Sequence, residues 1–171
     1  KQHIEFARDW ATMFNTTYGA ELFKLPQPRI QEQTAVIPGL DGEKMSKSRK
    51  NTIDLFGEGV DKRIKGIKTD STPPEAPKPV GGPLYQLLKV MAPPAEWPDL
   101  EKSWLAGGLG YGKYKDKLIE YYHAQFDGPR KRYQELMADP AELDRILADG
   151  ASRARAMAAP VVERVRKAVG L

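Results

Sequence analysis

A proline-rich segment in the middle of the chain limits its fold more than any other feature. Residues 70–83, DSTPPEAPKPVGGP, contain five of the 14 prolines and two of the 15 glycines. Proline has no backbone N–H to donate and glycine favours irregular backbone, so neither a helix nor a central strand continues through this segment. The segment therefore predicts either a domain boundary or an ordered connector within the 171 residues.

The part before this segment has the pattern of an α/β unit. Residues 1–15 repeat apolar side chains at helical spacing, and residues 22–30 carry two prolines, which exclude a central strand. A short apolar run from Ala35 to Ile37 predicts one strand, followed by turns at Pro38-Gly39 and Asp41-Gly42. This order predicts the second half of a parallel α/β sheet, in which ligands bind beyond the carboxyl ends of the strands.

The part after the proline-rich segment predicts helices throughout. Gly128-Pro129 and Pro160 predict interruptions of these helices. Asp139 followed by Pro140 predicts a helix start, because aspartate accepts bonds from free N–H groups and proline needs no donor at the first position. The predicted fold class is therefore α/β followed by an all-α bundle.

The first predicted helix begins at Lys1 with no methionine, capping residue or preceding strand. We therefore expect the chain to be the C-terminal portion of a longer protein. The net charge of +4 suits an anionic ligand or nucleic acid without requiring one. No cysteine occurs, and the two histidines, His3 and His123, lie far apart, so no metal site is expected. No apolar run could span a bilayer, so a soluble, cytoplasmic protein is expected.

A basic loop follows the predicted strand. Residues 41–50, DGEKMSKSRK, place four cations within seven positions, with two serines and Met45 between them. Such a charge cluster is commonly a solvated surface, which is one interpretation. The other is a phosphate site, because hydroxyl donors alternate with ammonium groups at a strand end. A solvated loop has no need of Met45, whose thioether could pack against the protein body or against a base.

The residues Lys44–Ser48, KMSKS, are the full signature of class I aminoacyl-tRNA synthetases. Four further stretches resemble tryptophanyl-tRNA synthetases: KQHIEFARD, TDSTPP, GGLGYGKYK and DPAELDRILADGASRARAMA. The resemblance covers nearly the whole chain. Tyrosyl-tRNA synthetase is the nearest alternative, and His3 together with TDSTPP favours the tryptophanyl family.

The resemblance implies three parts. Residues 1–56 would be the second half of a Rossmann-like catalytic domain with the KMSKS loop. Residues 57–139 would be a helical domain that binds the tRNA anticodon, and residues 140–171 would be helices that pack back toward the catalytic domain. The implied reaction joins tryptophan to ATP as an adenylate and then transfers it to the 3′ end of tRNA-Trp. The parent enzyme would be a homodimer.

The resemblance also implies roles for individual residues. Lys44 and Lys47 would be catalytic and meet the β- and γ-phosphates of ATP. The implied ATP-binding residues are Ile37 (beside the adenine), Lys44, Met45, Ser46, Lys47 and Ser48. Mg²⁺ would accompany ATP without a protein ligand in this segment. The basic residues expected to contact tRNA are Lys113, Lys115, Lys117, Arg130, Lys131 and Arg132.

Two hypotheses of different classes remain at this point. The chain is either part of an ATP-dependent ligase, inactive alone because the HIGH-like motif and the amino-acid pocket are missing, or a non-catalytic RNA-binding module with a vestigial KMSKS loop. The intact signature favours the ligase.

Overall fold

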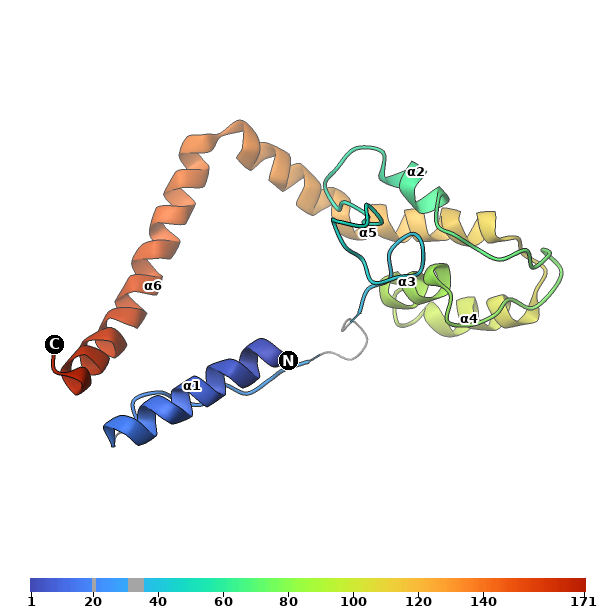
Figure 1. Ribbon diagram of the computed structural model, residues 1–171. Coiled ribbons are helices and arrows are strands. Elements are labelled where there is room, and N and C mark those ends of the chain that lie inside the picture. The colour runs from blue at the N-terminus through green and yellow to red at the C-terminus, as the bar shows by residue number, and fades with distance from the viewer. Residues whose placement is uncertain (20, 31–35) are drawn as a thin grey trace. The chain divides into compact units, whose positions relative to one another are not determined.

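The computed structural model describes residues 1–19, 21–30 and 36–171, and it is helical (Figure 1). The described residues form two compact units, one of Lys1–Gln31 with Leu136–Leu171 and one of Glu32–Glu135. The helices are α1 (Gln2–Tyr18), α2 (Val60–Lys65), α3 (Pro83–Met91), α4 (Trp97–Ala106), α5 (Tyr111–Ala138) and α6 (Pro140–Val169).

The described residues contain no β-strand, so the expected half of a Rossmann-like sheet is not confirmed. The predicted strand starts at Ala35, which lies outside the described residues. Its described end, Val36 and Ile37, is irregular, and the nearest pairing is an isolated antiparallel bridge between Pro38 and Lys44. A parallel strand obtains its hydrogen bonds from neighbouring strands. Within the described ranges no partner strand is available.

In the first unit, α1 is followed by an extended segment that runs back along it. Gly19 ends α1 with a φ of 62°, the left-handed conformation that glycine commonly adopts after the last residue of a helix. The Asn15 side chain donates to the Phe23 carbonyl at 2.8 Å and accepts from the Phe23 amide at 3.0 Å. Arg8 donates to the Pro26 carbonyl at 2.8 Å. Residues 22–30 are thus a connecting segment, which the two prolines predict.

The core of the second unit lies where α2, α3, α4 and α5 meet. Trp104 is buried among aromatic rings, with its ring centroid 4.7 Å from that of Tyr114 and 5.5 Å from that of Tyr85. Its indole N–H donates to the Pro79 carbonyl at 3.1 Å. The buried apolar residues are Val60, Ile64, Ile67, Leu84, Tyr85, Leu87, Leu88, Ala92, Trp104, Tyr114, Leu118, Tyr121 and Tyr122.

Two predicted helix breaks are wrong. α5 continues through Gly128-Pro129, and α6 continues through Pro160. A proline inside a helix removes one hydrogen bond and strains one turn, and the bonds on either side can still carry the helix across it. The predicted start of α6 is confirmed, because the Asp139 carboxylate accepts from the Glu142 amide at 3.0 Å and Pro140 is the first helical residue.

The proline-rich segment is an ordered connector inside the second unit. Lys78, only 2% exposed, donates from Nζ to the carbonyls of Pro73, Pro74 and Ala76 at 3.2, 3.0 and 2.9 Å. Three ammonium donors thus meet three carbonyl acceptors, which satisfies a buried charge without a carboxylate. Of the two predicted alternatives, a connector and a boundary, the connector is confirmed.

Candidate functional site

The basic loop is part of a compact hairpin, residues 37–51, which we call the loop hairpin. Three backbone bonds close it: Gly39 N–H to the Glu43 carbonyl at 2.7 Å, Met45 N–H to Ile37 at 2.9 Å, and Leu40 N–H to Asn51 at 2.9 Å. The two ends of the basic loop are therefore held together, by the bond between Leu40 and Asn51.

Asn51 organises the loop hairpin from inside. It is 4% exposed, and its Oδ1 accepts from the Ser46 amide at 2.8 Å. Its Nδ2 donates to Asp41 Oδ1 at 2.7 Å and to the Lys44 carbonyl at 3.3 Å. The hydrogen bond from Asn51 is the main cause that lowers the pKa of Asp41. Sequence reasoning missed Asn51, although an asparagine directly after a turn is a known signal for bonding to nearby backbone.

The predicted phosphate-binding side chains lie on the solvent side of the loop hairpin. Lys44, Lys47 and Ser48 are exposed, and Ser46 is half-buried. The hydroxyls of Ser46 and Ser48 are 2.8 Å apart. Two ammonium groups and a pair of hydroxyls on one exposed turn can bind the oxygens of an anion.

Ile37 and Met45 point in the other direction, toward the helical core. Their side chains line an apolar pocket of about 370 Å³ in the second unit. The Met45 side chain therefore packs on the protein body. The other lining residues are Ile53, Leu55, Ile64, Leu87, Val90, Met91, Leu118, Tyr122 and Phe126.

Arg63 of α2 holds the exit of the loop hairpin. Its Nε donates to the Thr52 carbonyl at 2.8 Å and its Nη2 to the Lys50 carbonyl at 3.0 Å. Lys50 has a φ of 54°, the left-handed conformation that a lysine rarely adopts. The Arg63 guanidinium, which donates one bond to Lys50 and one to Thr52, helps to keep the strained turn in place.

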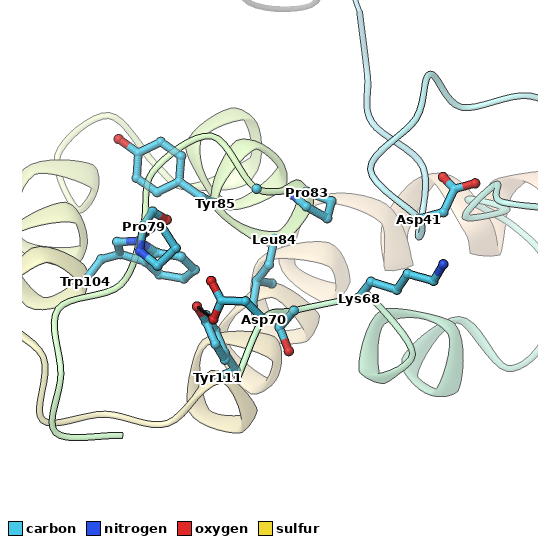
Figure 2. Close-up of a pocket in the computed structure, with 11 residues that line it drawn as sticks. Asp41, Lys68, Asp70, Pro79, Pro83, Leu84, Tyr85, Trp104 and Tyr111 are labelled. Carbon is cyan, nitrogen blue, oxygen red and sulfur yellow. Dashed lines mark hydrogen bonds between the residues drawn. The ribbon is translucent and has the colours of Figure 1, made fainter. Parts of the chain in front are cut away.

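A second pocket of about 260 Å³ lies beside the loop hairpin, with Asp41 and Lys68 at one end (Figure 2). Between Lys68 and Trp104, Asp70 accepts from the Tyr111 hydroxyl at 2.8 Å and from the Thr72 amide at 2.9 Å (Figure 2). Bonds from Thr72, and then from Tyr111, lower the pKa of Asp70. The remaining lining residues are Thr69, Pro79, Gly82, Pro83, Leu84, Tyr85 and Trp104.

Two of the six basic residues expected to contact RNA form internal bonds. Lys115 donates to the carbonyls of Lys65 and Ile67 at 2.8 and 2.7 Å, at the C-terminal end of α2. Arg130 donates to the Gly57 carbonyl. Both side chains tie α5 to other segments of the second unit, which is a structural role whether or not they also contact RNA.

The other four basic residues lie on the surface of α5. Lys117 and Arg132 each pair with a glutamate three residues along the helix, at 2.9 and 3.4 Å. Lys113 and Lys131 are exposed. The geometry thus leaves Lys113 and Lys131 as the side chains of this set that are most open to a partner.

The described part of the chain has no group of three or more His, Asp or Glu side chains that could hold a metal ion. In the same part, no helix is long and apolar enough to cross a membrane.

A family model described as "tRNA synthetases class I (W and Y)" matches residues 1–141. The chain belongs to this family. The match includes the whole loop hairpin and α1 to α5, so the KMSKS stretch stands in the sequence context of a synthetase and is not an isolated five-residue coincidence.

Two curated relatives of this chain are tryptophan–tRNA ligases. The tryptophan–tRNA ligase of Xylella fastidiosa is 45% identical over 99% of this chain and 40% of its own length. That of Rhodopirellula baltica is 44% identical over 99% of this chain and 54% of its own length. The chain thus spans about half or less of the length of these relatives.

A solved structure supports the class I synthetase fold. The tryptophanyl-tRNA synthetase of Campylobacter jejuni, crystallised with ADP and tryptophan, superposes with a TM-score of 0.78 at 39% identity. The match covers 99% of this chain and 54% of that protein.

Proposed function

We propose that the chain is the loop-bearing and helical portion of a tryptophan–tRNA ligase. Such an enzyme joins tryptophan to ATP, releases pyrophosphate and transfers the tryptophanyl group to the 3′ end of tRNA-Trp. One observation carries the proposal: the KMSKS turn is intact, and it presents both lysines to solvent from a closed hairpin. Relatives of this name, 44% and 45% identical over 99% of the chain, support tryptophan as the substrate.

Formation of the adenylate depends more on charge stabilisation by the protein than on covalent catalysis. The tryptophan carboxylate attacks the α-phosphate, the bond to the β-phosphate oxygen breaks, and negative charge grows on the departing pyrophosphate. In this proposal the ammonium groups of Lys44 and Lys47 neutralise that charge. The hydroxyls of Ser46 and Ser48 donate to the phosphate oxygens or brace the turn. Ile37 lies beside the adenine.

We further propose the three-part organisation. Residues 1–56 belong to the Rossmann-like catalytic domain, residues 57–139 bind the tRNA anticodon, and residues 140–171 pack back toward the catalytic domain. Mg²⁺ arrives with ATP and is held by its phosphates. The complete protein is a cytoplasmic homodimer that draws its amino-acid pocket from residues outside this chain.

The test is ATP–pyrophosphate exchange by the full-length protein that contains this chain, with tryptophan or tyrosine as the amino acid. The proposal expects exchange that depends on tryptophan. Exchange that depends on tyrosine would assign the chain to the other branch of the family. Binding of tRNA without any exchange would show an RNA-binding module with a vestigial loop.

A further inference from the structure

Asn51 carries no charge and lies outside the KMSKS stretch, yet its side chain contacts three points of the basic loop. We propose that Asn51 is a positioning residue, which fixes the backbone of the loop so that Lys44 and Lys47 meet the same anion. This inference rests on the proposed function, since it takes the anion to be the triphosphate of ATP.

The three hydrogen bonds of the Asn51 side chain hold the loop at three positions along its sequence. Nδ2 donates to the Asp41 carboxylate, where the loop begins, and to the Lys44 carbonyl, directly on the backbone of a proposed catalytic residue. Oδ1 accepts from the amide of Ser46, one position before Lys47. A primary amide is the group that donates two bonds and accepts at a third site without adding charge.

Asn51 packs closely against Gly39. A Cβ atom on Gly39 would stand 2.3 Å from Asn51 Nδ2 and 2.4 Å from its Cγ, so only glycine admits the amide here. Arg63 holds the carbonyls of Lys50 and Thr52, the two neighbours of Asn51 in sequence. The backbone on both sides of Asn51 is therefore held by Arg63, and the Asn51 side chain binds the loop to this fixed backbone.

Charge explains why the loop needs such an anchor. Lys44, Lys47, Arg49 and Lys50 repel one another, and this repulsion favours an open loop until an anion arrives. A neutral, buried amide with paired donors and acceptor holds the backbone without cancelling the positive field that attracts the phosphates. Phosphate binding then starts from a preorganised turn, which lowers the entropic cost of binding.

The experiment compares variants of the full-length protein in ATP–pyrophosphate exchange. Asn51→Ala should lower kcat about tenfold to a hundredfold, because small displacements of groups that position the reaction have effects of this size. The KM for tryptophan should stay within about twofold, since the pocket for the amino acid does not include the loop. Gln125→Ala is the matched control: it also removes an amide-to-carbonyl bond, to Met91 at 2.7 Å, away from the loop.

Two further variants distinguish a positioning role of Asn51 from a general role in folding. Asn51→Asp places a second carboxylate against Asp41 and should lower kcat further than Asn51→Ala. The double variant Asp41→Asn with Asn51→Asp exchanges amide and carboxylate across the bond between positions 41 and 51, without restoring the bond to the Lys44 carbonyl, and should recover part of the kcat lost in Asn51→Asp. The melting temperature of each protein is measured alongside. If Asn51→Ala does not fold, the positioning role of Asn51 is tested by comparing the kcat of Asn51→Asp with that of the double variant.

Two readouts keep this inference distinct from the proposed function. If the wild type shows no exchange with any amino acid, the proposed function fails, and the positioning role for ATP fails with it. The bond itself is tested by NMR titration, in which Asn51→Ala should return the pKa of Asp41 toward its ordinary value. Wild-type exchange with an unchanged kcat in Asn51→Ala, or a double variant no better than Asn51→Asp, would overturn the positioning role alone.

Discussion

His123 Nε2 lies 3.0 Å from Asp61 Oδ1, and this contact joins α5 to α2. The other ring nitrogen, Nδ1, lies 2.9 Å from Asp127 Oδ1 on α5 itself. The bond with Asp127, and then the bond with Asp61, raises the pKa of His123. Because α2 also carries Arg63, the histidine supports the helix that holds the loop hairpin.

The raised pKa of His123 predicts a pH-dependent stability. The folded state binds the proton more tightly than the unfolded state, whose histidine titrates near 6.5, so the stabilisation is complete below about pH 6.5. It is lost as the pH rises through the raised folded value. The imidazole is 38% exposed, so solvent screening limits the effect to about 1 kcal/mol or less. In urea unfolding at pH 5.5, the wild type should have a higher free energy of unfolding than His123→Gln. This difference should become smaller by pH 8. An equal difference at both pH values would contradict the protonated bridge, and His3→Gln is the control.

Lys47→Ala should slow adenylate formation more than it weakens tryptophan binding. In the proposed function the ammonium meets charge that develops on pyrophosphate, so its contribution would lie mainly in the transition state. Loss of one such donor typically costs about 3 kcal/mol, or about a hundredfold in kcat. ATP–pyrophosphate exchange measures it, with the exposed Lys62→Ala on α2 as control. An unchanged kcat with a raised tryptophan KM would remove Lys47 from the catalytic residues.

Lys78→Met should destabilise the second unit, although methionine has nearly the same length. The substitution leaves three carbonyls of the connector without their buried donor, and unmet groups of this kind cost about 2 kcal/mol or more in total. Chemical unfolding of Lys78→Met and of Lys62→Met, whose lysine is exposed, gives the comparison. Equal stability of the two variants would show that the carbonyl cage around Lys78 contributes little.

Lys115→Ala and Lys113→Ala should affect different properties, although the two lysines are only two positions apart on α5. Lys115 donates to two backbone carbonyls, so its loss should lower the free energy of unfolding by about 1–2 kcal/mol. Lys113 is exposed, so its loss should leave the free energy of unfolding unchanged and weaken tRNA binding. The affinity of the variant for tRNA should also depend less on salt concentration than that of the wild type. Thermal unfolding and tRNA titrations at two salt concentrations measure both. The reverse pattern would show that Lys115, and not Lys113, is the RNA contact.

Features that depend on neighbouring residues were predictable. Gly19 ends α1, Asp139 caps α6, and the Lys44–Ser48 stretch indicates the family. The partners of Asp139 and Gly19 lie within four residues along the chain, so residue type and spacing suffice to predict these contacts. The predicted breaks in α5 and α6 failed for a related reason. Local proline chemistry does not include the support that the rest of a long helix gives to a strained turn.

By itself, the sequence determined which groups are present: the ammonium and hydroxyl groups of the KMSKS turn, the apolar helix faces and the helix caps. Only the tertiary structure decided which charges are free and which are engaged. Lys78 is buried in a cage of carbonyls, and Lys115 donates to a carbonyl 50 residues away, whereas Lys44 and Lys47 face solvent. The reason is physical: the chemistry of a lysine is the same at every position, and its role depends on the acceptors that the folded backbone brings within hydrogen-bonding distance.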